Sequence, residues 1–316
     1  MMRRMVDGCH EGGVESIAVL TASEPVIYGR FGYGLSTQSL RWSVPRGPRN
    51  LKAVAGSDGN RMRLVDPRAA YERCQALYDA QVPTRPGMLA REGGWHASAL
   101  FDHESQRGGC RPMLRVIAEG PDGTLVAYAR YAVREDYSTR GRPGCKVNVR
   151  EVRARDAASY AAIWRFLLDL DLTDEVMSPS MPLDDPIIHL LNDARAAQPV
   201  LADGLYTRLV DVDEALAVRR YSVPVDMVFE VADAFCPWNA GRWRLTGDAD
   251  GAVCAKTGDP ADILIGVREL GSAYLGGFTL GALHRASLIE ELRPGAVTAA
   301  SLAFASDPVP WLPFGF

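Results

Sequence analysis

One ten-residue stretch, PVIYGRFGYG at residues 25–34, combines three glycines with three aromatic rings. A tyrosine held in a glycine-rich turn, as Tyr28 would be, can present its phenol to a bound substrate. The reference pKa of a tyrosine is about 10, so the phenol is protonated at neutral pH and can donate to a leaving group. The residues alone leave a second interpretation open, in which the loop joins a helix to a strand and its rings pack in the core.

The elements around this stretch must hold it in place. Residues 1–9 predict a helix, because their apolar side chains share one face. Residues 16–21 form a short apolar run and predict a buried strand. Ser23 as N-cap and Pro25 in the first turn are typical of a helix start, and Gly29 predicts that this helix is short.

The rest of the chain mixes helical and strand patterns, which indicates an α+β fold. Residues 46–60 are rich in Gly and Pro and predict a linker. Residues 113–120 and 125–135 alternate around a PDG turn, as an antiparallel hairpin does. A helix is expected to begin at Asp156.

Composition excludes several classes of protein. The net charge of −4 gives no basic surface for a nucleic acid. The six cysteines contain no C-x-x-C pair and the five histidines no H-x-x-x-H pair, so a metal site is not indicated, although distant ligands could converge. No run of eighteen apolar residues and no signal-peptide core is present, and scattered cysteines favour reduced thiols. We therefore expect a cytoplasmic protein without a membrane span.

Residues 22–34, ASEPVIYGRFGYG, resemble the A-S-E-x-x-I-Y-G-R-F-G-Y-G stretch of the Eis-like (enhanced intracellular survival) N-acetyltransferases, a branch of the GNAT superfamily. Residues 184–195, 203–221 and 284–295 also resemble that family. The similarity covers the whole chain in order, as far as Phe316.

This resemblance implies an α+β architecture of three parts. The C-terminal part of an N-terminal GNAT domain would occupy residues 1–48. A central GNAT-like domain would occupy residues 61–205, and a domain of the sterol-carrier-protein type residues 206–316. The resemblance also implies a homo-oligomer, specifically a hexamer.

The resemblance further implies the roles of individual residues. Acetyl-CoA would be the cosubstrate, no metal would be needed, and the acceptor would be a primary amine such as an aminoglycoside, a polyamine or a lysine side chain. Tyr28 would be the general acid that protonates the coenzyme A thiolate, and the terminal carboxylate of Phe316 would be the base. Because an α-carboxylate has a reference pKa of only about 3.5, relay through a water is favoured over direct abstraction. Ser23 could bind coenzyme A through its hydroxyl, or serve only as the N-cap.

In the family, the loop that binds the coenzyme A pyrophosphate directly precedes the helix that matches residues 1–9. We therefore expect either that the start codon lies inside a longer gene, or that the gene is shortened. Residues 16–45 would then contribute strands to a sheet whose other strands are missing. Since an unpaired apolar edge favours disorder or aggregation, we expect these residues to be poorly supported.

Two other classes of function remain open. The chain could be a non-catalytic homologue that serves in assembly. It could also bind a hydrophobic ligand through its C-terminal domain, with the apolar residues 273–283 and 310–316 lining the cavity.

Overall fold

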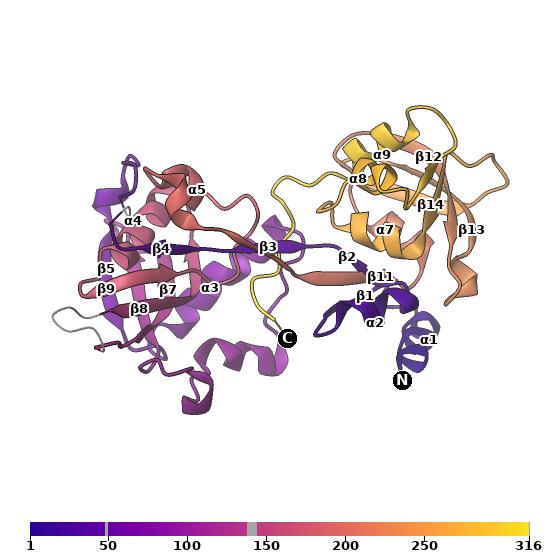
Figure 1. The fold of residues 1–316 in the computed structure, drawn as a ribbon. Coiled ribbons are helices and arrows are strands. Elements are labelled where there is room, and N and C mark those ends of the chain that lie inside the picture. The colour runs from indigo at the N-terminus through magenta and orange to yellow at the C-terminus, as the bar shows by residue number, and fades with distance from the viewer. Residues whose placement is uncertain (48–49, 138–143, 316) are drawn as a thin grey trace. The chain divides into compact units, whose positions relative to one another are not determined.

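The computed structural model describes residues 1–47, 50–137 and 144–315, apart from the side chains of residues 96–99. The chain divides into two compact units. Residues 1–39 and 203–316 form the first unit, which combines the indigo and yellow ends of the chain in Figure 1, and residues 40–202 form the second. Strands β3 (Gln38–Arg41) and β10 (Val200–Asp203) carry the chain across the two unit boundaries.

A three-stranded antiparallel sheet joins the two ends of the chain in the first unit. Strand β11 (Leu205–Leu209) lies between β1 (Ile17–Thr21) and β2 (Gly34–Leu35). Ile17 lies opposite Leu209, and Leu35 lies opposite Tyr206. The expectation that residues 16–45 lack support is therefore wrong, because a strand from far along the chain pairs with both β1 and β2.

Short helices flank this sheet. The helix predicted at the start of the chain is confirmed as α1 (Met2–Gly12), which ends at Gly13 in the left-handed conformation with φ 61°. Its one fully buried side chain, Val6, packs with Val210 and Cys236. The other short segments of this part are α2 (Pro25–Tyr28) and the 3₁₀ turns η1 (Gly29–Phe31) and η7 (Pro237–Asn239).

A second sheet of the first unit has the strand order β14-β13-β12-β15-β16. Strands β12 and β15 run parallel, and the other neighbours run antiparallel. The ring of Phe304 packs edge-on against Tyr221 and Phe229, with centroid distances of 5.2 and 5.9 Å, at the centre of this core. The elements are α6 (Val212–Val218), β12 (Val225–Ala232), β13 (Gly241–Gly247), β14 (Ala252–Lys256), β15 (Ile263–Gly266), α7 (Val267–Tyr274), α8 (Leu280–Arg285), β16 (Glu290–Glu291) and α9 (Ala296–Phe304).

The second unit is built on a six-stranded sheet with the order β4-β9-β8-β7-β6-β5. Its neighbours run antiparallel except for the parallel pair β8 and β9. The predicted hairpin is confirmed as β6 and β7, which are joined at the PDG turn. The strands are β4 (Ser43–Pro45), β5 (Arg61–Val65), β6 (Leu114–Glu119), β7 (Leu125–Arg134), β8 (Cys145–Ala154) and β9 (Thr173–Met177).

The two faces of this six-stranded sheet differ in character. Apolar residues of one face pack against α4 (Ala157–Leu168), whose Trp164 contacts Trp42 at a centroid distance of 4.5 Å. Because side chains alternate along a strand, Ile117 and Tyr128 point to the opposite face, where they meet Cys74 of α3 (Tyr71–Gln81). The remaining segments are η2 (Ser57–Gly59), η3 (Val82–Thr84), η4 (Gly93–Leu100), η5 (Glu104–Gln106), α5 (Ile187–Leu190) and η6 (Ala194–Ala197).

Helix α4 begins where the sequence predicts. The side chain of Asp156 accepts a hydrogen bond from the backbone N–H of Ser159 at 2.8 Å, and the Ser159 hydroxyl closes a reciprocal capping box. With 12 residues, α4 is the longest helix in the described part of the chain. None of the described helices is long and apolar enough to cross a membrane.

Candidate active site

The predicted catalytic stretch folds as two consecutive helical turns. Pro25 occupies the first position of α2, as predicted, and Tyr28 ends this helix. Gly32 then closes η1 in the left-handed conformation with φ 83°, and its N–H donates to the carbonyl of Gly29 at 3.0 Å. The predicted N-cap role of Ser23 is wrong: with Pro25 at the first helical position, the capping position falls on the next residue, Glu24.

A side chain would be crowded at all three glycines, slightly at Gly29 and severely at Gly32 and Gly34. A Cβ on Gly29 would lie 3.2 Å from the guanidinium carbon of Arg268, and a Cβ on Gly32 would lie 1.8 Å from Nη1 of Arg208. A Cβ on Gly34 would lie 2.0 Å from the backbone carbonyl oxygen of Arg268 in α7. The glycines therefore let the loop approach α7 and β11 closely, which fixes the position of Tyr28.

Two tyrosines of the stretch have different environments. Tyr33 is 1% exposed, and burial raises its pKa to about 12, although the nearby Arg208 opposes this shift. Tyr28 is only partly buried, and its ring meets that of Tyr33 edge-on at a centroid distance of 6.2 Å. Tyr33 is therefore a buried packing residue, whereas Tyr28 stays partly exposed to solvent.

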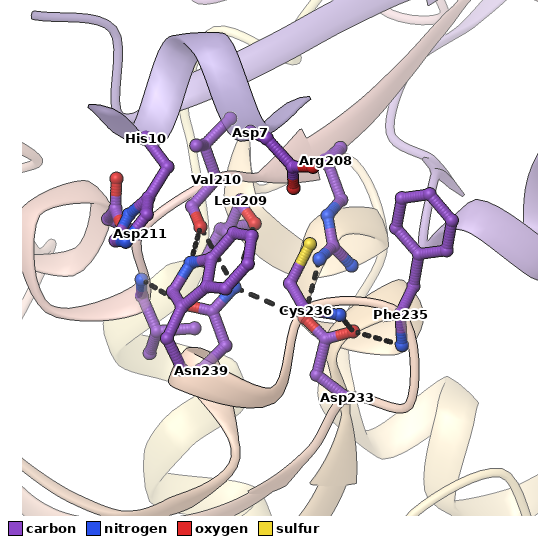
Figure 2. A network of polar contacts seen from close by, with 12 residues as sticks. Asp7, His10, Arg208, Leu209, Val210, Asp211, Asp233, Phe235, Cys236 and Asn239 are labelled. Atoms are coloured by element: carbon purple, nitrogen blue, oxygen red, sulfur yellow. Dashed lines mark hydrogen bonds and ion pairs between the residues drawn. The ribbon is translucent and has the colours of Figure 1, made fainter. Parts of the chain in front are cut away.

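A buried ion pair lies against this turn at Gly32. Figure 2 shows the pair, Arg208 and Asp233, with the groups around it. Nη2 of Arg208, on β11, donates to Oδ2 of Asp233 at 2.5 Å, and both side chains are at most 1% exposed. Nε and Nη1 of Arg208 have no hydrogen-bond partner among the described residues. Because Nη1 is the atom nearest to the position that a Cβ on Gly32 would take, the loop packs directly on the ion pair.

Further hydrogen bonds hold Asp233 in its orientation. Its Oδ1 accepts from the backbone N–H groups of Phe235 and Cys236 at 3.1 and 2.9 Å. The Asn239 amide donates to Oδ2 of Asp233 at 3.1 Å and to the carbonyl of Val210 at 2.9 Å. This arrangement satisfies both carboxylate oxygens, which a fully buried charge requires.

The helix α1 is attached to the same network, as Figure 2 shows. Nδ1 of His10 lies 2.5 Å from Oδ1 of Asp211, and the His10 ring stacks on Trp238 at a centroid distance of 4.2 Å. At the other end of the helix, the guanidinium of Arg3 lies 3.8 Å from the ring centroid of Phe235 and donates to its carbonyl. Phe235 in turn packs edge-on against Phe31 of the loop at 5.2 Å.

The C-terminal tail returns toward β2. A Cβ on Gly277 would lie 2.5 Å from the carbonyl oxygen of Ser36 and 3.1 Å from Pro310, so the tail at Pro310 runs beside the residue that follows β2. Trp311 and Leu312 are buried. Phe316, the predicted base, lies outside the described residues.

Charged groups of both signs are exposed around the Tyr28 segment, with Glu24 at the N-cap of α2. The side chain of Arg30 is exposed two residues after Tyr28, and the exposed Arg268 lies against Gly29. Ser23 is exposed on the same segment. In the part of the chain that the structure describes, no three His, Cys, Asp or Glu side chains gather in a way that could hold a metal ion.

The residues that sequence reasoning missed are Arg208, Asp233 and Asn239. Arg208 is the one charged residue of the otherwise uncharged strand LYTRL, and a charge at such a position is a signal for a buried ion pair. Its partner Asp233 lies 25 residues later, and Asn239, which donates to Asp233, follows six residues after that, separations that no local pattern specifies.

Two family models match the chain. An acetyltransferase (GNAT) domain matches residues 87–219, and a sterol carrier protein domain matches residues 212–313. The chain is 48% identical to an uncharacterized N-acetyltransferase of Streptomyces avermitilis, over 100% of the chain and 76% of that protein. It is 32% identical to N-acetyltransferase Eis of Mycobacterium tuberculosis, over 97% of the chain and 74% of that protein.

Comparison with solved structures leads to the same family as the sequence comparisons. The chain superposes on Eis1 from Mycobacterium abscessus with a TM-score of 0.82 at 33% identity, over 100% of the chain and 77% of that structure. A GCN5-related N-acetyltransferase from Anabaena variabilis, at 19% identity and a TM-score of 0.83, shares the fold. The fold is thus that of a GNAT acyltransferase joined to a sterol-carrier-type domain, which confirms the predicted fold class. The chain belongs to the Eis-like family of N-acetyltransferases.

Proposed function

We propose that this chain transfers the acetyl group of acetyl-CoA to primary amines, of the aminoglycoside, polyamine or lysine type. Tyr28 is the general acid and the terminal carboxylate of Phe316 is the base. The observation that supports the role of Tyr28 is its fixed, partly exposed position, between the buried Tyr33 and the contact of Gly29 with Arg268.

Each proton that moves in the proposed reaction has a donor and an acceptor. Acetyl-CoA supplies an acetyl thioester, whose carbonyl carbon the neutral amine nitrogen attacks. The C–N bond forms, the C–S bond breaks, and Tyr28 donates its phenolic proton to the departing sulfur. The carboxylate of Phe316 accepts the proton that the amine loses, through a water, and solvent returns a proton to Tyr28.

The residues present fit a polyanionic cosubstrate. Arg30 is exposed two residues after Tyr28, the exposed Arg268 lies against Gly29, and guanidinium groups bind phosphate oxygens well. The exposed hydroxyl of Ser23 would add a hydrogen bond to coenzyme A.

The motif in residues 22–34 also leads us to propose three further properties of the chain. They are domains at residues 1–48, 61–205 and 206–316, a cytoplasmic location and assembly into a hexamer. The native mass of the purified chain in solution, measured by light scattering, tests the last of these.

The alternative of a hydrophobic-ligand binder receives no support from the apolar residues 273–283. Tyr274, Leu280 and Leu283 of this stretch are packed within the core of the first unit. A surface groove of about 610 Å³ beside β15 is lined by other residues, among them Glu269 and His284.

The central experiment compares Tyr28→Phe with Tyr33→Phe in the full chain. Release of free coenzyme A thiol from acetyl-CoA is followed with an aminoglycoside, a polyamine and a lysine peptide as acceptors. Loss of a general acid lowers kcat by about 10²- to 10⁴-fold, whereas removing the buried hydroxyl of Tyr33 leaves kcat within a few fold. Equal kcat values for wild type and Tyr28→Phe would contradict the assignment of Tyr28.

Two further measurements test the other parts of the proposal. Residues added after Phe316 remove the terminal carboxylate from its place and should abolish transfer, while acetyl-CoA binding persists. Calorimetric titration of acetyl-CoA into the full chain tests the cosubstrate itself, and no binding at millimolar concentration would contradict the proposal.

A further inference from the structure

A groove of about 610 Å³, here named the β15 groove, lies beside strand β15 in the first unit. Ile263 and Ile265 of this strand are at most 1% exposed and belong to the core, whereas Leu264 between them points to the other face of the sheet and is 36% exposed. Leu288, which also lines the groove, is 54% exposed. The groove therefore offers apolar surface that a ligand can cover.

The groove is open because the strand next to β15 is short. Strand β16 pairs with β15 only at Ile263 and Leu264. The chain turns sharply just before β16, at Ser287, which has φ 57°. In the part of the chain that the structure describes, Ile265 and Gly266 therefore have no strand partner on the side of β16.

Two carboxylates supply the charge of the β15 groove. Glu269 of α7 is partly buried and Glu290 of β16 is exposed, and both line the groove. Among the described residues neither of them has an ion-pair partner, and no arginine or lysine lines the groove. Arg268, the neighbour of Glu269 in sequence, lies against Gly29 instead. The remaining titratable side chain of the groove is that of His284, so the groove is complementary to a cation.

The two carboxylates lie beside positions of β15 that are two residues apart. Glu290 is directly opposite Leu264 in the antiparallel pair, so both side chains are on the same face. The carboxylate of Glu269 lies over Gly266, because a Cβ on Gly266 would be 2.3 Å from its Oε2. The step from Leu264 to Gly266 spans about 7 Å of strand. Alternate side chains of an extended peptide are separated by the same distance and point the same way.

We propose that the β15 groove binds an extended segment of another protein that carries two basic side chains separated by one residue. One basic group pairs with Glu290 and the other with Glu269. The aliphatic stems of these side chains cover Leu264 and Leu288. The backbone of the segment lies beside Ile265, where β16 does not extend. This site belongs to the first unit alone and does not depend on the proposed acetyl transfer.

The test measures the fluorescence anisotropy of a rhodamine-labelled peptide, Ser-Arg-Ser-Arg-Ser-Ser, with the full chain at constant ionic strength. Both peptide ends are blocked and arginine has no primary amine, so acetyl transfer does not contribute to the signal. We expect saturable binding of this peptide. The peptide Ser-Arg-Arg-Ser-Ser-Ser has the same composition and charge, and should bind roughly fivefold more weakly, because adjacent side chains of an extended chain point to opposite faces.

Variants of the chain show whether the peptide lies in the groove. Glu290→Gln and Leu288→Ser change exposed side chains, so both should keep the fold and weaken binding, the first by roughly fivefold. Glu214→Gln is the matched control for the loss of one negative charge. Glu214 is exposed on α6, which packs against β14 at the opposite edge of the sheet, and should bind the peptide as the wild type does.

Four results would overturn the proposal. The first is the absence of saturable binding, and the second is equal affinity for the two peptides. The third is equal weakening by Glu290→Gln and Glu214→Gln, or binding of arginine amide as tight as that of the peptide, which would identify a small cation as the occupant. The fourth is a lower native mass of Leu288→Ser by light scattering, which would identify a second copy of the chain as the occupant.

Discussion

Replacing Gly32 by alanine tests whether the contact between the Tyr28 turn and the Arg208–Asp233 ion pair is as tight as the structure indicates. The added Cβ would lie 1.8 Å from Nη1 and 2.8 Å from the guanidinium carbon of Arg208, and 3.0 Å from Cγ1 of Val267. The side chain of Arg208 is completely buried and bound to Asp233, so it cannot move away from the added Cβ. Either the ion pair or the turn must shift.

Two contributions set the size of the effect. An alanine in the left-handed conformation that Gly32 adopts, with φ 83°, costs about 1–2 kcal/mol. Overpacking of a tight site adds about 1–3 kcal/mol. The sum of about 2–5 kcal/mol corresponds to a decrease in Tm of roughly 4–20 °C for a domain of this size. A displacement of Tyr28 by about 1 Å would lower acetyl transfer roughly 100-fold.

Gly295 provides the matched control. It belongs to the same unit and has φ 85°, yet a Cβ at this position meets nothing within 4 Å. Gly295→Ala therefore measures the backbone term alone, about 1–2 kcal/mol. Thermal unfolding and thiol-release kinetics of both variants give the comparison. If Gly32→Ala is no more destabilised than Gly295→Ala, the clash with Arg208 is not real and the reasoning fails.

Two predictions concern buried carboxylates. Burial raises the pKa of Asp185 to about 6. The folded state therefore holds a proton that the unfolded state releases near pH 4. The free energy of unfolding should fall by about 3 kcal/mol as the pH rises from 4 to 6. In Asp185→Asn, which keeps an acceptor for the hydroxyl of Tyr160, denaturant unfolding should lack this decline, and parallel curves for the two proteins would refute the assignment. Asp233→Ala should lower the free energy of unfolding by about 3–5 kcal/mol, because it leaves Arg208 buried without its partner. In the same unfolding assay, adding Arg208→Met to Asp233→Ala should restore part of that loss.

Local patterns in the sequence predicted the elements that depend on local interactions. The helix at Asp156 is specified by a capping box within four residues, and the hairpin of β6 and β7 by a short turn between alternating strands. Pro25 marked the start of α2 correctly, but Ser23 did not, because the cap position is set by the proline and falls on Glu24.

Long-range pairing was not predictable in the same way. Strand β11 lies between β1 and β2, but the whole of the second unit separates it from them in the sequence. For this reason residues 16–45 were wrongly expected to be unsupported. The alternating charges of β6, β7 and β8 are typical of a face exposed to solvent. In the structure α3 packs on that face, and Arg115 and Glu151 become buried.

The central place of β11 also sets an order of events during synthesis. Strands β1 and β2 leave the ribosome before their common partner, which is complete only when Leu209 has been made. At usual translation speeds this interval lasts roughly 10–40 s. Residues 40–202 form a compact unit that contains none of β11, whereas β1 and β2 lack their common partner during this interval. A nascent chain halted before β11 should therefore be protease-resistant in its second unit and sensitive in β1 and β2.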